Sequence, residues 1–289
     1  MEREIVYQKN RVEIVRVTPN LYFRRGDMPA RRQSNGAFLI SGEVVAAVDA
    51  TTMEAAEEMM AEALEVFGHP LRYVFLTHGD GDYVAGLPVF LEQPLTIFCS
   101  HRLLGQVVPE GYDGPATFLG IEGVQTLWLG GLEVELSTVP IAAHSPRDLL
   151  IRVIRDECVV AGDTGVSLDH LYFHAADPVE WARLLRDMDA RGGRAILPGH
   201  GDIYPWSHWK EVADFIDLLV RAGNECLKGL TEGEAAALDD DKSTQLASGY
   251  LAGPGADAKT IRDTAGASAE RELRMVIQAL VRKRTGAKA

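Results

Sequence analysis

The segment Phe75-Leu76-Thr77-His78-Gly79-Asp80-Gly81-Asp82-Tyr83 carries the most informative pattern in this chain of 289 residues. An apolar run typical of a buried strand ends at Thr77, and the potential metal ligands His78, Asp80 and Asp82 follow at every second position. Glycines separate them, and glycine permits the tight turns that would bring alternate side chains toward one cation. Taken alone, the segment is also compatible with a turn held by aspartate side chains.

Three more clusters of this kind follow, each at the expected end of an apolar strand. They are Ala143-His144-Ser145-Pro146, Ala161-Gly162-Asp163-Thr164 and Leu197-Pro198-Gly199-His200-Gly201. A lone histidine at a strand end is usually a hydrogen-bonded surface residue. Four successive clusters rich in metal-ligand side chains favour a shared metal site instead.

The apolar runs around these clusters predict many short strands, with hairpin turns at Ser41-Gly42 and Gly130-Gly131. Residues 239–264 are rich in Asp, Gly, Ala and Ser, which predicts a flexible loop. Strands are expected at 5–7, 12–17, 21–23, 37–40, 44–48, 73–76, 95–99, 124–129, 132–138, 149–154, 158–161 and 195–197, and helices at 51–67, 178–188, 206–227, 231–238 and 270–284.

Strands and helices alternate in two successive blocks up to about residue 205, and only helices are expected after it. This order predicts an α/β fold in which two sheets face each other with helices outside. Residues 1–205 would form the layered domain, and residues 206–289 a helical C-terminal extension that packs on it.

The charge balance excludes some classes of partner. With 29 basic and 42 acidic residues the net charge is −13, which argues against a nucleic-acid or anionic-membrane binder. The three cysteines are scattered and are expected to be small buried apolar residues. No signal peptide and no apolar run of membrane-spanning length is found, so we expect a cytoplasmic protein.

The four clusters together resemble the metallo-β-lactamase superfamily, which includes hydrolases, thioesterases, lactonases, nucleases and some diiron oxidoreductases. The family pattern is HxHxDH, a distant histidine, an aspartate after glycine, and a histidine in a PGHG-like step; here the first motif reads HxDxDY. The resemblance covers roughly residues 10–230 and includes the stretch 35–40, which is similar to the family's opening strands. It implies an αββα sandwich of two facing mixed β-sheets.

The resemblance also implies a dinuclear site with two divalent metal ions. Tyr83 stands where the family has a histidine ligand of the second metal. A phenol there could coordinate as phenolate, donate a hydrogen bond to a bound oxygen, or swing away. Carried over position by position, the first metal would be held by His78, Asp80 and His144, and the second by Asp82 and His200, with Asp163 bridging both.

The aspartate at position 80, where the family has a histidine, changes the expected metal. Three carboxylates among the ligands suit harder ions, so we expect iron or manganese, with zinc also compatible. The flavodiiron branch resembles this chain in having a carboxylate at the same motif position. A degenerate site with one metal or none is the alternative to the dinuclear one.

The function that the resemblance implies is a metallo-hydrolase acting on a small ester, thioester, lactone or phosphoester. A metal-activated hydroxide would attack, Asp82 or Asp163 would orient it and relay its proton, and Tyr83 would assist the oxyanion or the leaving group. Asp49 and Asp202 are candidates for orienting the imidazoles from behind.

Two other classes of function stay open at this point. One is a diiron oxygen-handling or redox protein, similar to the flavodiiron branch but without its flavodoxin domain. The other is a non-catalytic binding protein on the same fold. The expected partner is a small-molecule substrate, and the amphipathic C-terminal helices could also serve a homodimer. The basic patch Arg24-Arg25 with Arg31-Arg32 is expected to be a solvated loop.

Overall fold

The computed structural model describes residues 4–9, 11–26, 34–139 and 142–286, so Arg31 and Arg32 lie outside the described residues. The chain forms two compact units. The first comprises residues 1–140, 147–165 and 193–205, and the second comprises residues 141–146, 166–192 and 206–289. The packing predicted for the extension 206–289 on the layered domain stays a prediction.

The first unit is built on two mixed β-sheets. In the eight-stranded sheet, β1 to β5 are antiparallel neighbours and β5 to β8 are parallel; in the six-stranded sheet, β12 and β13 are parallel and the other pairs antiparallel. The first sheet follows chain order: β1 (Glu4–Lys9), β2 (Val12–Arg16), β3 (Leu21–Arg25), β4 (Gly36–Ser41), β5 (Val44–Val48), β6 (Leu71–Phe75), β7 (Thr96–Ser100) and β8 (Thr117–Ile121). The second has the order β14 (Tyr204–Pro205), β13 (Ala195–Pro198), β12 (Cys158–Gly162), β11 (Leu149–Val153), β10 (Leu132–Thr138) and β9 (Val124–Leu129).

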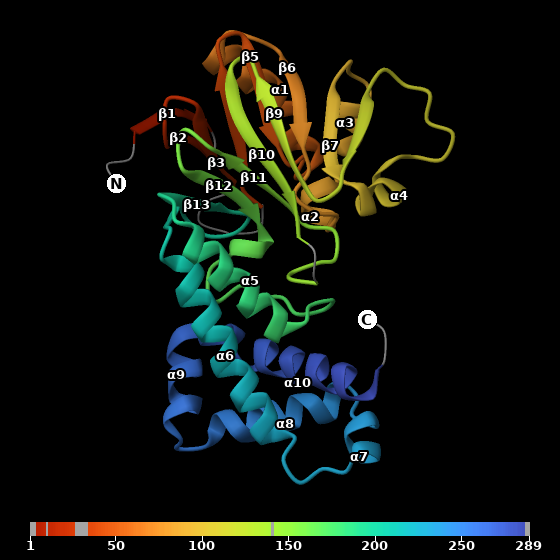
Figure 1. The fold of residues 1–289 in the computed structure, drawn as a ribbon, viewed down its shortest axis with the longest axis vertical. Coiled ribbons are helices and arrows are strands. Elements are labelled where there is room, and N and C mark those ends of the chain that lie inside the picture. Colours follow the sequence, from red (N-terminus) through yellow and green to blue (C-terminus); the bar gives the residue numbers. More distant parts are fainter. Residues whose placement is uncertain (1–3, 10, 27–33, 140–141, 287–289) are drawn as a thin grey trace. The chain divides into compact units, whose positions relative to one another are not determined.

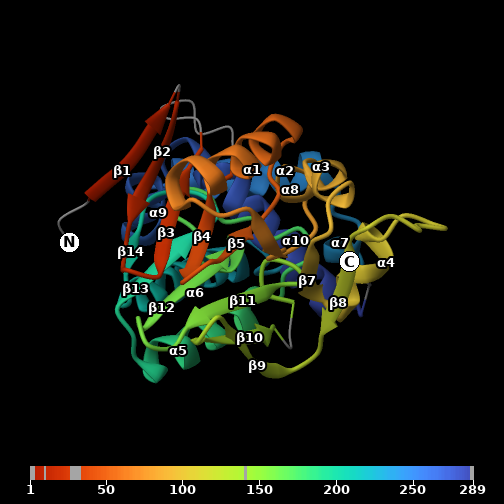
Figure 2. The ribbon, with the colours of Figure 1, turned by 90° about the horizontal axis from the view of Figure 1, so that it is seen from above.

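The two sheets face each other across a shared core, and Figure 2 shows them as two layers. Phe23 and Phe75 of the first sheet and Ile151 and Leu197 of the second belong to one cluster of buried apolar side chains. The other face of the first sheet packs against helices, which follows from the period-two alternation of buried side chains along each strand. The helices of this unit are α1 (Met53–Phe67), α2 (Gly81–Val84), α3 (Leu87–Leu91) and α4 (Leu104–Val107).

The predicted fold class, two mixed sheets with helices and further helices at the C-terminus, is confirmed. Both predicted hairpins are present, and the positive φ angles of Gly42, Gly130 and Gly131 (57°, 54° and 94°) explain why glycine is needed there. Strand β8 and the short helices α2 to α4 were not predicted.

Arg24 corrects one expectation, because it is a buried residue rather than part of a solvated loop. Its guanidinium Nε lies 2.7 Å from Glu62 Oε2 and its Nη2 lies 2.7 Å from Glu58 Oε2, both carboxylates belonging to α1. The side chains of Arg24 and Glu62 are 1% and 3% exposed, whereas that of Glu58 is 31% exposed. The ion pair therefore joins β3 to α1 from inside the core.

Replacing Glu62 with alanine is expected to lower the free energy of unfolding by about 3–5 kcal/mol, because it leaves a buried guanidinium without its main counter-charge. Glu58→Ala is the matched control: that carboxylate is partly solvated, so we expect a loss of about 1 kcal/mol or less. Urea denaturation followed by circular dichroism measures both. Equal losses in the two variants would contradict this account of the ion pair.

The second unit is mainly helical, and its helices α6, α8, α9 and α10 are the teal and blue ribbons of Figure 1. The prediction of a flexible loop at 239–264 is wrong, because most of this segment is helical. Asp239 caps α8 by accepting a hydrogen bond from the Lys242 N–H, and buried Ala247 and Ile261 pack α8 and α9. The helices are α5 (Pro178–Arg191), α6 (His208–Cys226), α7 (Glu232–Ala236), α8 (Asp240–Ala252), α9 (Ala256–Ala265) and α10 (Ala269–Thr285).

Within the described residues, none of the helices combines the length and apolar character needed to cross a membrane. Cys99, Cys158 and Cys226 are free thiols. Cys99 and Cys158 are buried, as predicted, and Cys226 is half-buried.

Candidate metal centre

Three predicted ligands of the first unit follow the carboxyl ends of strands. His78 comes three residues after the end of β6, Asp163 directly follows β12, and His200 comes two residues after β13. Because β12 and β13 are parallel, their carboxyl ends meet at one edge of the sheet, which brings Asp163 and His200 together. Asp82 lies in α2, one short turn after His78.

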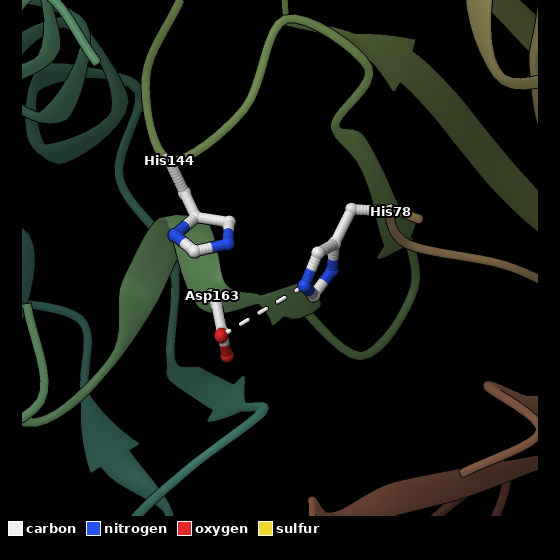
Figure 3. A group of neighbouring side chains, drawn as sticks. All are labelled: His78, His144 and Asp163. Atoms are coloured by element: carbon white, nitrogen blue, oxygen red, sulfur yellow. Dashed lines mark ion pairs between the residues drawn. The ribbon is translucent and has the colours of Figure 1, made fainter. Parts of the chain in front are cut away.

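These four side chains converge. Asp163 Oδ2 lies 3.8 Å from His78 Nε2 and 3.9 Å from His200 Nε2, and His200 Nε2 lies 3.1 Å from Asp82 Oδ2. In Figure 3 the dashed line between Asp163 and His78 joins their Oδ2 and Nε2 atoms. Ligand atoms about 2.1 Å from one tetrahedral cation stand about 3.4 Å apart, so this donor set and its spacing fit a divalent metal ion.

Burial differs among the four residues. The side chains of His78, Asp163 and His200 are 1%, 7% and 10% exposed, and that of Asp82 is 42% exposed. Buried carboxylates and imidazoles this close together are costly to desolvate unless something compensates their charges. A bound cation would supply that compensation.

Tyr83 is fully buried, and its hydroxyl donates a hydrogen bond of 2.5 Å to Asp163 Oδ1. Burial, and then the nearby Asp163 carboxylate, raise the pKa of the Tyr83 phenol well above its usual value. The phenol is therefore protonated in this arrangement. Asp163 consequently has one oxygen held by Tyr83 and the other facing the two imidazoles.

Gly199 is the residue that makes this arrangement sterically possible. A Cβ atom at this position would lie 1.9 Å from the Tyr83 hydroxyl and 2.4 Å from Asp163 Oδ1. The Gly199 backbone is also fixed, because its N–H donates to the Gly162 carbonyl and its carbonyl accepts from the Asn35 N–H. Only glycine fits the step before His200.

A chain of hydrogen bonds supports His78 from behind. The N–H and hydroxyl of Thr77 donate to the buried Asp49 carboxylate at 2.7 Å and 2.9 Å, and the Thr77 hydroxyl oxygen lies 3.0 Å from His78 Nδ1. With its own proton directed to Asp49, that oxygen is available as an acceptor for a proton on His78 Nδ1. The tautomer that results leaves the lone pair on Nε2, the nitrogen that faces Asp163.

Asp49 has φ = +64°, an unusual value for a residue other than glycine, and burial raises the pKa of its carboxyl group well above the usual value. The structure thus places Asp49 behind His78, through Thr77, as the sequence suggested. Asp202, the other residue suggested for this role, has its carboxylate 3.3 Å from Arg25.

Sequence reasoning missed two side chains that hold the loops of the site. The Asn35 amide donates to the carbonyls of Pro198 and Gly201, on either side of His200. The Ser34 hydroxyl donates to the Asp82 carbonyl. In the sequence, the only signal at Asn35 is the similarity of the stretch 35–40 to the family's opening strands.

The other two predicted ligands are Asp80 and His144. Asp80 precedes α2 as its N-cap residue and is partly buried. His144 belongs to the second unit, where it is buried with its ring 6.2 Å from Tyr172 and 6.3 Å from Trp181. Their roles as ligands stay predictions.

Solved structures with the same fold include several metallo-beta-lactamases. The enzyme from Pontibacter korlensis is 16% identical, with a TM-score of 0.59 over 70% of this chain and 99% of its own. The enzyme from Erythrobacter litoralis is 18% identical, with a TM-score of 0.60 over 74% and 99%. DIM-1 metallo-beta-lactamase is 22% identical, with a TM-score of 0.59 over 71% and 98%. At these identities the likeness concerns the fold.

A comparison with curated proteins gave no match. The sequence profile of the metallo-beta-lactamase superfamily, however, matches residues 31–219, well over half of the chain. That range contains both sheets from β4 onward and all the converging residues described above. The chain belongs to the metallo-beta-lactamase superfamily.

Proposed function

We propose that this protein is a metal-dependent hydrolase of a small ester, thioester, lactone or phosphoester. The observation that carries the proposal is the position of the Asp163 carboxylate, 3.8 Å and 3.9 Å from two imidazole nitrogens that share one buried site. Membership of a superfamily made up mostly of hydrolases supports hydrolysis in general. The class of substrate is our inference.

We assign the site two divalent ions. When bound, such ions lower the pKa of a water ligand to about 7 and polarise the substrate oxygen. Three carboxylates in the donor set favour iron or manganese, and zinc is also compatible with it. The residues that would hold the ions are His78, Asp80, Asp82, His144, Asp163 and His200.

In the first unit, some residues orient the metal-binding side chains and one transfers protons. Tyr83 fixes the orientation of Asp163 by holding its Oδ1 atom. Thr77 and Asp49 fix the orientation and tautomer of His78. Asp82 is the most exposed of the four converging side chains and lies in hydrogen-bond contact with His200, so it is best placed to pass a proton between the site and solvent.

The proposal is tested by measuring the metal content of the purified protein and its activity on a panel of substrates. Protein purified without added metal from an iron-replete culture should contain close to two equivalents of iron or manganese. It should turn over at least one ester, thioester, lactone or phosphoester, and a chelator should remove that activity. A clean content of two zinc ions would overturn the metal assignment. Absence of both metal and turnover would favour a binding protein, and a strong visible band from phenolate bound to ferric iron would favour the redox alternative.

Tyr83→Phe is expected to weaken metal binding by about 10–100-fold, because it keeps the buried ring but releases Asp163 Oδ1. Competition with a chromophoric chelator measures the affinity for Mn²⁺ or Zn²⁺. Tyr112→Phe is the matched control, since it also removes a hydroxyl that makes hydrogen bonds, to Leu91 and Ala116, outside the metal site. Unchanged affinity in Tyr83→Phe would show that Tyr83 does not position Asp163.

A further inference from the structure

The second unit contains a pocket of its own. Its volume is about 560 Å³, within the range of small-molecule sites, and every residue that lines it belongs to this unit. The walls come from the segment 172–174, the end of α7, the start of α8 and one side of α10. None of the residues assigned to the metal site takes part.

Two guanidinium groups give the pocket its charge. Arg274, Gln278 and Arg282 stand four residues apart on α10, so they form one stripe along the pocket. Among the described residues that line the pocket, Asp240 is the one carboxylate, and it lies 2.8 Å from Arg274 and 2.6 Å from Gln278. With histidine counted as neutral, the two guanidiniums and one carboxylate give the lining a net charge of +1, whereas the whole chain has a net charge of −13.

These polar groups are held in place. Asp240 bridges Arg274 and Gln278 from the first residue of α8, and Arg282 donates to the Phe173 carbonyl at 3.1 Å. Burial lowers the pKa of the Arg282 guanidinium, which shows that its charge is partly withdrawn from water. An anion next to Arg282 would restore the electrostatic stabilisation lost in this way.

Ser243 provides a second, independent indication that the pocket binds a ligand. It lines the pocket and is 0% exposed, and its hydroxyl has no hydrogen-bond partner among the described residues. A buried hydroxyl without a partner is destabilising, and native proteins keep few of them. An acceptor inside the pocket would satisfy it.

The other residues of the lining are apolar except Tyr172, His174 and Thr285. Phe173, Leu238, Met275 and Val281 contribute side chains to the walls, and Phe173 is fully buried. Such walls bind an apolar body, and the guanidiniums and Ser243 bind a charged head. We propose that this pocket is a binding site for a small organic anion, a monocarboxylate with an apolar chain or ring.

Calorimetric titration of the full-length protein with sodium octanoate tests the proposal, with octanamide as the uncharged ligand of the same shape. We expect octanoate to bind at least about tenfold more tightly than octanamide, as for a hydrogen-bonded charge in a partly buried site. Equal binding of the two ligands, or no binding of octanoate up to millimolar concentration, would overturn the proposal.

Two variants test whether octanoate binds next to Arg282. Arg282→Gln should weaken octanoate binding by about tenfold or more. Arg284→Gln is the matched control, because it removes the same charge two residues further along α10, from a side chain that instead contacts Asn224. Equal weakening by both changes would mean that octanoate responds only to overall charge, which contradicts a site at Arg282.

Ser243→Ala gives a second signature that does not depend on Arg282. Removing an unsatisfied buried hydroxyl should raise the melting temperature of the ligand-free protein, and the further rise caused by octanoate should become smaller. A variant that melts lower without ligand and keeps the full octanoate shift would overturn the role of Ser243.

Discussion

Replacing Asp163 with alanine is expected to lower metal affinity by more than about 100-fold and to abolish turnover. The loss should exceed the 10–100-fold effect of removing a group that only supports a ligand, because Asp163 Oδ2 itself faces both His78 and His200. Asp163→Asn should lose metal too, since an amide keeps an acceptor for Tyr83 but not the charge. Element analysis after dialysis, and activity on the best substrate of the panel, measure these effects.

The matched control is Asp202→Asn, which removes a carboxylate two residues from His200. That carboxylate is 41% exposed and lies beside Arg25, so metal content should stay the same and stability should change by about 1 kcal/mol or less. An Asp163→Ala protein that kept its metal and full turnover would remove the proposed mechanism.

Gly199→Ala is expected to be the most disruptive single-methyl change in the site. The new Cβ would lie 1.9 Å from the Tyr83 hydroxyl and 2.4 Å from Asp163 Oδ1, and the backbone hydrogen bonds on both sides of Gly199 resist a shift of the main chain. We expect a stability loss of about 1–3 kcal/mol, as in other overpacked sites. Turnover should fall by about 100-fold or more, because displacing a reacting group by about 1 Å has that effect.

Gly81→Ala is the matched control, since a Cβ there meets no atom within 4 Å. It should leave both stability and metal binding nearly unchanged. The double variant Gly199→Ala/Tyr83→Phe removes the closest clashing atom and should recover part of the stability lost by Gly199→Ala, as thermal melts would show. A Gly199→Ala protein with normal stability and metal content would mean that the loop before His200 adapts more easily than its hydrogen bonds indicate.

The positions of most strands along the chain, and of the candidate metal-binding residues at their ends, could be predicted because both are local features of the sequence. A short apolar run precedes each of His78, Asp163 and His200 in the sequence, and each of these runs forms a strand in the structure. That Asp163 and His200 lie together was not predictable in this way, because it depends on the parallel pairing of β12 with β13, which the structure shows. The helices of 239–264 were missed because four of their six buried residues are the small residues alanine or serine, which carry little apolar signal.

The sequence by itself determined the layered α/β fold and the side chains able to bind metal, because hydrophobic periodicity and motif spacing are properties of neighbouring residues. Only the tertiary structure decided that Tyr83 holds Asp163, 80 residues away, that Asp82 pairs with His200, 118 residues away, and that α10 lines a charged pocket. Each of these depends on the distance between atoms from separate elements. Such distances are set by close packing within the folded unit, which no local pattern in the chain records.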